Sequence, residues 1–220
     1  MLNFKHQFIS IIFLLTLVIT NPAYSQTRLR IVDQNNTPLP NAVIEYSTNP
    51  ATQQPADEQI YIMDQINKQF APHVLIVPEN SLVSFPNSDD IRHHVYSFSS
   101  AKKFELKLYA GKPKSPLRFD KRGLVVMGCN IHDSMVGYIY VSANNNTFKS
   151  DEQGVVLLKR DLAPKTRLQV WHPNNTLGLS KHTEFTIDRS MLNQSEIILM
   201  MNVNKPEARD SFEDLHFHED

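Results

Sequence analysis

Short runs of valine, isoleucine, leucine and aromatic residues constrain the fold of this chain most strongly. Many of them alternate apolar and polar residues, as half-buried strands do, and segments rich in Asn, Asp, Pro and Gly separate them. The sequence therefore predicts an all-β protein. The expected strands span residues 28–32, 42–46, 73–77, 82–85, 94–98, 104–109, 123–127, 136–141, 155–158, 167–171, 185–187 and 197–200.

One segment departs from this strand pattern. Residues 57–70 place Ile60, Met63, Ile66 and Phe70 three or four residues apart, which is the spacing of one helix face. We therefore predict a single helix over residues 57–70. A surface loop before the next strand has a similar composition and stays the alternative.

The amino-terminal residues have the features of a secretory signal peptide. Lys5 supplies a positive charge, residues 8–19 form an apolar stretch, and Ala23 and Ser25 are the small residues expected before a cleavage site. We expect cleavage after Ser25 and export to the periplasm. Because no later segment has about 18 uninterrupted apolar residues, we expect no membrane span in the mature form.

The composition narrows the class of function. The chain is 41% hydrophobic and 20% charged, which is ordinary for a globular protein. Its formal net charge of −1 gives no basic field, so we expect no binding to nucleic acid. Gly-rich phosphate loops and the GxSxG and HExxH motifs are absent from the sequence, and we do not expect an enzyme.

Residues 128–135, GCNIHDSM, hold the most specific motif of the chain. They place Cys129, the only cysteine, and His132 and Met135 at Cys-x2-His-x2-Met spacing, and the adjacent His93 and His94 lie upstream. A thiolate, two imidazoles and a weak axial thioether form the ligand set of a blue-copper site. A buried structural thiol and an intermolecular crosslink are the alternatives for an unpaired cysteine in an oxidising compartment.

Other metal centres and other polar residues are less well supported. A two-copper centre needs a second cysteine, and structural zinc sites do not use methionine. Asp89 and Asp90 are expected to be solvated charges in a turn. We expect no ligand role for the remaining upstream and downstream histidines, apart from weak adventitious metal binding in the acidic tail. These histidines are His73, His172, His182, His216 and His218.

From about residue 70 to residue 141, the chain resembles small blue-copper proteins of the plastocyanin and amicyanin kind. The short Cys-x2-His-x2-Met loop is most similar to amicyanin. In that family the upstream ligand is the His of a Pro-His-Asn-Val strand, and residues 93–95 match its His-Asn-Val part. The resemblance implies a Greek-key cupredoxin β-sandwich with one type 1 copper. Its implied ligands are His93, Cys129, His132 and Met135.

The upstream ligand has an alternative. Strand alternation groups His94 with Tyr96 and Phe98 on a face that looks more like a core than the face of His93. By the family alignment, His94 instead takes the place of the Asn whose backbone braces the cysteine sulfur. Either histidine is therefore open as the ligand from this strand.

Two further resemblances concern the whole mature chain. Residues 85–99, 104–113, 119–135 and 170–173 are similar to exported cupredoxin-like proteins labelled methylamine utilization proteins. Residues 32–44 and 149–170 resemble a carboxypeptidase regulatory-like β-sandwich. Asn36 lies near the position of its usual turn glycine and is expected to adopt the left-handed turn that asparagine tolerates. The implied fold is a cupredoxin inserted in or beside a second small immunoglobulin or transthyretin-like β-sandwich.

The expected division of the chain follows from these resemblances. It comprises a signal peptide at residues 1–25, the first part of the second sandwich at 26–50 and the cupredoxin domain at 57–143. The second part of the second sandwich spans 144–203, and an acidic disordered tail spans 204–220.

The sequence thus predicts an exported blue-copper protein that carries single electrons between transient redox partners. The resemblance implies that electrons leave through the edge of His132, within an apolar patch of Ile131, Val136 and Met127. Asp133 favours a partner with a basic docking face. One alternative is a periplasmic copper-binding or delivery protein without electron-carrier turnover. Another is a partner-binding or carbohydrate-binding scaffold.

Overall fold

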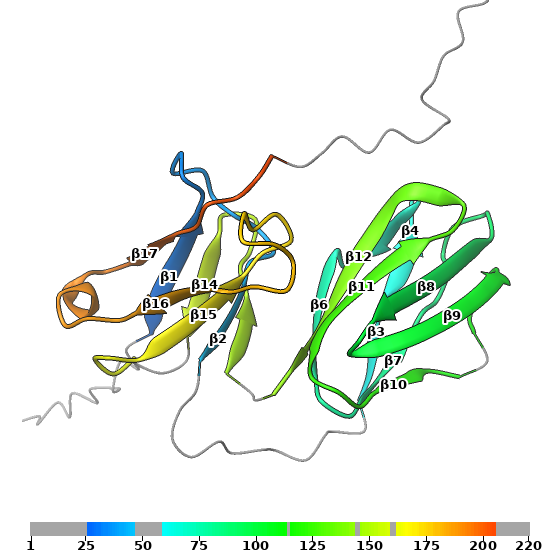
Figure 1. Ribbon diagram of the computed structural model, residues 1–220, viewed down its shortest axis with the longest axis horizontal. Coiled ribbons are helices and arrows are strands. Elements are labelled where there is room, and N and C mark those ends of the chain that lie inside the picture. The colour runs from blue at the N-terminus through cyan, green and yellow to red at the C-terminus, as the bar shows by residue number, and fades with distance from the viewer. Residues whose placement is uncertain (1–25, 47–58, 114, 144–145, 159–161, 206–220) are drawn as a thin grey trace, which may run out of the picture.

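The computed structural model (Figure 1) describes residues 26–46, 59–113, 115–143, 146–158 and 162–205. These residues form strands and one short 3-10 helix, Met191–Asn193 (η1), so the predicted all-β class is confirmed. Among them, no helix has the length and apolar character needed to cross a lipid bilayer. The predicted signal peptide and residues 206–220 of the predicted tail lie outside the described residues.

The middle of the chain forms one β-sandwich (Figure 1). Its larger sheet has the order β6-β12-β11-β8-β9, and its smaller sheet has the order β10-β7-β3. Side chains from both sheets pack into one buried cluster, which includes Val83, Val95, Phe119 and Cys129. The strands of the larger sheet are Val74–Pro78 (β6), His132–Ser142 (β12), Gly123–Cys129 (β11), His93–Ser99 (β8) and Lys102–Tyr109 (β9); those of the smaller sheet are Leu117–Phe119 (β10), Ser81–Ser84 (β7) and Ile60–Ile62 (β3).

The segments before and after this sandwich pair with each other to form a second one. Thr27–Val32 (β1) pairs with Val155–Leu158 (β14) and, in parallel, with Ile197–Met200 (β17). The opposite sheet has the order β13-β2-β15-β16, and the two sheets enclose a separate buried core. Its strands are Thr147–Lys149 (β13), Val43–Tyr46 (β2), Arg167–Trp171 (β15) and Thr183–Thr186 (β16).

Two sequence expectations about the second sandwich have different outcomes. Asn36 adopts a φ of 61°, so the left-handed conformation expected of it is confirmed. The predicted domain boundaries near residues 50, 57 and 144 fall outside the described residues and stay predictions.

The predicted helix over residues 57–70 is wrong in its described part. After β3, Asp64–Ile66 (β4) pairs with Gln69–Ala71 (β5) in a two-stranded hairpin. Of the four apolar residues that suggested one helix face, Met63 and Phe70 are buried, whereas both isoleucines are exposed. The helical spacing therefore arose from short strands that bury different sides.

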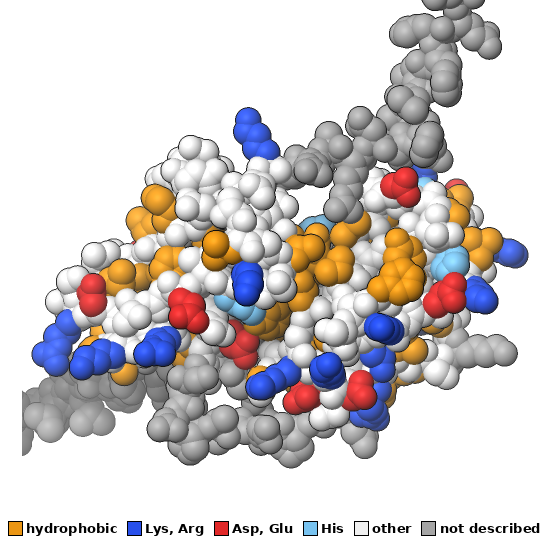
Figure 2. Space-filling view, viewed as in Figure 1, with side chains coloured by type: hydrophobic (Ala, Val, Ile, Leu, Met, Phe, Trp, Pro, Cys, Tyr) orange, Lys and Arg blue, Asp and Glu red, His pale blue; other side chains and the backbone are white. Residues whose placement is uncertain are grey.

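The two sandwiches meet along an aromatic junction. Trp171 packs against Tyr138 and Tyr140 of β12, with ring centroids 5.4 and 6.1 Å apart. Val43 and Val74 complete this buried cluster. Figure 2 shows hydrophobic side chains along the line where the two halves of the molecule meet. The second sandwich thus covers part of the outer face of the larger sheet, and the covered part is apolar.

Candidate metal centre

A tight hairpin brings Cys129 and His132 together. Strand β11 ends at Cys129, β12 begins at His132, and Asn130 and Ile131 form the turn between them. The two residues are direct cross-strand partners, a position in which side chains on one face approach each other closely. The Cys-x2-His-x2-Met segment was expected to be a loop, but His132 and Met135 belong to β12. A register shift at the end of β11 accommodates residues 133–135.

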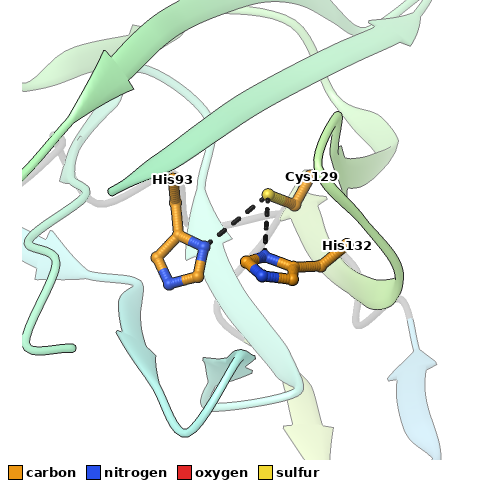
Figure 3. Close-up of side chains that lie close together, drawn as sticks. All are labelled: His93, Cys129 and His132. Atoms are coloured by element: carbon orange, nitrogen blue, oxygen red, sulfur yellow. Dashed lines mark hydrogen bonds between the residues drawn. The ribbon is translucent and has the colours of Figure 1, made fainter. Parts of the chain in front are cut away.

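His93 reaches the same point from the neighbouring strand. Strand β8 pairs with β11 at Cys129, and the Asn130 N–H donates to the carbonyl oxygen of His94 over 3.0 Å. The Cys129 Sγ lies 3.7 Å from Nδ1 of His93 and 3.7 Å from Nδ1 of His132. Figure 3 shows both rings and the thiol directed at one another.

The three side chains form a buried donor cluster. Their donor atoms all lie within 4.8 Å of one another. The exposed fractions are 0% for His93, 3% for Cys129 and 8% for His132. Within the described ranges, no other group of three His, Cys, Asp or Glu side chains comes together in this way.

Asp89 determines which nitrogen of His93 faces the thiol. Its Oδ2 accepts a 2.7 Å hydrogen bond from Nε2 of His93. A carboxylate accepts and does not donate, so Nε2 carries a proton and Nδ1 is the ring nitrogen that faces Cys129. This is the arrangement of carboxylate, histidine and metal that orients ligands in many metal sites.

Asp89 is not the solvated turn charge that the sequence suggested. Its side chain is only 10% exposed and also accepts hydrogen bonds from the backbone N–H groups of Asn67 and Lys68. Burial raises its pKa, but the hydrogen bonds from Lys68, His93 and Asn67 outweigh burial and leave the pKa below its usual value. The group is therefore an anionic acceptor beside His93.

His94 lies on the opposite face of β8. Its Nε2 is 2.9 Å from Glu105 of β9. Phe98, on the same side, is 79% exposed, whereas the side chains of Val95 and Ser97 are buried with His93. Strand alternation was therefore a wrong guide to the buried face, because the outer face of β8 carries aromatic side chains, of which Phe98 is exposed.

Met135 is buried with Cys129. The expected apolar surface patch around His132 is present only in part. Met135 is 1% exposed and belongs to the same hydrophobic cluster as Cys129. Ile131 is 48% exposed and Val136 is half-buried, but Met127 is 1% exposed. The expectation that Met127 contributes to a surface patch is wrong, because its side chain points into the core.

The remaining histidines of the described residues have other partners. The His73 ring packs edge-on against Tyr138, and Nε2 of His182 lies 2.9 Å from the Tyr140 hydroxyl. Nε2 of His172 lies 3.2 Å from the carbonyl oxygen of Pro40. Burial lowers the pKa of all three imidazoles, for His172 to about 4. His216 and His218 lie outside the described residues.

The donor set fits copper. Thiolate and imidazole together suit copper and zinc, and a neighbouring methionine without a second cysteine favours copper. His93, Cys129 and His132 would hold the ion, and the buried Met135 is positioned in the same core.

No protein-family model and no curated protein sequence matches the chain. Among solved structures, the copper-containing nitrite reductase of Thermus scotoductus SA-01 is similar over 51% of this chain and 28% of its own length, at 23% identity and a TM-score of 0.37. A purple cupredoxin from Nitrosopumilus maritimus matches 38% of this chain and 98% of its own, at 22% identity and a TM-score of 0.33. A variant of amicyanin in its reduced Cu(I) form matches 46% of this chain and 99% of its own, at 22% identity and a TM-score of 0.33.

Proposed function

We propose that this protein is an exported type 1 copper protein of the cupredoxin class. It carries single electrons between redox partners and is not itself an enzyme. The observation that carries the proposal is the buried cluster of His93, Cys129 and His132, with donor atoms within 4.8 Å. A signal peptide at residues 1–25 would direct the chain to the periplasm.

Each side chain has a distinct part in the proposed site. Bound copper would supply one-electron chemistry by alternating between Cu(I) and Cu(II). Cys129 would provide a thiolate ligand, and His93 and His132 would provide imidazole nitrogens. Met135 would provide a weak thioether ligand, which in such sites tunes the reduction potential. All four side chains are buried, with exposed fractions of 8% or less.

The surface next to His132 is the proposed docking site for redox partners. His132 is 8% exposed, and the neighbouring Ile131 presents an apolar side chain that is 48% exposed. Asp133 is exposed beside them. A transient partner with an apolar contact and a basic rim would fit this surface, and its association would weaken as salt concentration rises.

Copper stoichiometry in matched variants tests the ligand assignment. We expect one copper per chain in the unaltered protein, measured by native mass spectrometry after removal of excess metal. His93→Ala and Cys129→Ser should lose it, whereas His94→Ala should retain it, because His94 faces the other side of the sheet. Loss of copper from His94→Ala together with retention in His93→Ala would contradict the assignment.

Copper delivery is the alternative function of the same residues. A delivery protein would bind Cu(I) without a reversible one-electron cycle and would pass it to a copper-free acceptor. Repeated electrochemical oxidation and reduction without loss of metal would favour the electron carrier. Rapid transfer of Cu(I) to an acceptor, without such a cycle, would favour delivery.

A hollow between the sandwiches supports a second candidate function, binding of a carbohydrate or another partner. It has a volume of about 990 Å³, at the upper end of the range for ligand sites. Trp171, the only tryptophan of the chain, lies in its wall, so quenching of its fluorescence by oligosaccharides would test the idea. Quenching should persist in Cys129→Ser. Polar lining residues include Glu45, Arg122, Arg167, Gln169, His182 and Glu184.

We extend the proposal to the finer resemblances of the sequence. The pairing of β1 and β2 with later strands supports a carboxypeptidase regulatory-like sandwich split around the cupredoxin. The likeness to proteins labelled methylamine utilization proteins is consistent with an exported electron carrier. It does not identify a redox partner.

A further inference from the structure

The hairpin of β4 and β5 holds the carboxylate that orients His93. Its turn residues, Asn67 and Lys68, have φ values of 54° and 57°, the left-handed pair of a type I′ turn. Their N–H groups donate to the two oxygens of Asp89 over 2.6 and 2.9 Å. Two of the three donors to Asp89 therefore come from the hairpin backbone, and the third is His93.

The same hairpin holds the loop that carries Asp89. The Asp64 carboxylate accepts from the Ser88 hydroxyl over 2.8 Å and from the Ser88 N–H over 3.2 Å. The Ser88 N–H also donates to the carbonyl oxygen of Gln65 over 3.0 Å. The Gln65 side chain, which is fully buried, donates to the carbonyl oxygen of Pro86 over 2.9 Å. Residues 86–89 are thus fixed from the hairpin side.

The hairpin also contacts the strand that carries His132. Phe70 of β5 is 3% exposed and packs on Gly137 of β12. A Cβ atom at Gly137 would lie 2.7 Å from Cβ of Phe70, so only glycine allows this approach. One element therefore touches the strand of His132 and, through Asp89, the ring of His93.

We propose that the β4–β5 hairpin is a positioning element for the metal centre. It fixes Asp89, and Asp89 fixes the ring of His93 relative to Cys129 and His132. The effect on bound copper rests on the proposed function, whereas the effect on His93 does not. Ligands that are held before the metal binds lose little freedom on binding, which slows release of the metal.

Variants that disturb the hairpin without altering Asp89 or a ligand test this proposal. Asp64→Ala removes the acceptor for the Ser88 hydroxyl, and Gly137→Ala pushes on Phe70 from the other side. Gln69→Ala is the matched control, because it lies on the same hairpin and its side chain is exposed. Two variants on opposite sides of the hairpin protect the test against misfolding of either one.

The first readout is solvent exchange of the His93 Nε2 proton, followed by NMR in the metal-free protein. We expect exchange about tenfold faster in Asp64→Ala and Gly137→Ala, and unchanged exchange in Gln69→Ala. The second readout is the rate of copper release, which should rise about tenfold, the lower end for groups that orient metal ligands. Unchanged proton exchange in both hairpin variants would overturn the proposal.

The two readouts separate this inference from the proposed function. Faster proton exchange in a protein that binds no copper would leave the positioning role standing and refute the copper function. Copper binding with equal release rates and equal proton exchange in all variants would refute the positioning role alone.

Discussion

Replacing Asp89 by asparagine tests how strongly the carboxylate supports the metal centre. Asp89 accepts from three N–H groups, whereas asparagine keeps one oxygen and places an NH2 group at the other position. At least one donor therefore loses its acceptor in a site that is 10% exposed. Loss of such a charge-assisted hydrogen bond costs about 1.5–3 kcal/mol. Copper affinity should fall about 10- to 100-fold, or about 1.4–2.8 kcal/mol.

Asp90→Asn is the control for this change. It makes the same charge change one residue away, where the side chain is exposed. Copper affinity is measured by competition with a coloured Cu(I) chelator, and the stability of the metal-free protein by urea unfolding. We expect a large loss of affinity for Asp89→Asn and almost none for Asp90→Asn. Equal effects of the two variants would show that Asp89 acts only through general charge and would refute the reasoning.

Three further predictions concern the core, the junction and pH. Met135→Leu should change the free energy of unfolding by less than about 1.5 kcal/mol, since the side-chain volume is conserved. It should nevertheless alter the visible spectrum of the copper form. Met127→Leu, in the same core cluster, should leave that spectrum unchanged. Tyr140→Phe removes the 2.8 Å hydrogen bond to Glu45 and should cost about 1–3 kcal/mol in urea unfolding. His172 has a folded pKa of about 4 against 6.5 unfolded, so the unfolded chain binds the extra proton between these values and stability falls as pH drops through them. His172 contributes at most about 3 kcal/mol to this loss, so the loss should be smaller, but not absent, in a His172→Gln variant followed by urea unfolding at each pH, because His73 and His182 remain.

Short-range patterns explain which parts of the fold the sequence could predict. Alternation identifies a strand wherever one side of it is buried, as in Thr27–Val32 and Arg167–Trp171. It failed over residues 57–70, because two strands separated by a turn of Asn67 and Lys68 imitate helical spacing. That turn lacks the glycine that usually signals a two-residue hairpin.

The candidate site was predictable where its residues are close in sequence. A two-residue turn after Cys129 necessarily places His132 opposite it, so spacing alone indicates their contact. The contact of Asp89 with His93 depends on a loop held by a distant hairpin, and no local pattern reveals it. The buried face of β8 was also hidden, because the aromatic residues Tyr96 and Phe98 stand on its outer face.

A visible absorption spectrum tests the central proposal most directly. The mature protein would receive one equivalent of Cu(II), then ascorbate, and then ferricyanide. A thiolate–copper site of the proposed kind predicts an intense blue band that bleaches on reduction and returns on oxidation, and that is absent in Cys129→Ser. A protein that binds copper but stays colourless, or that binds none, would contradict the assignment of a type 1 electron-transfer site to His93, Cys129, His132 and Met135.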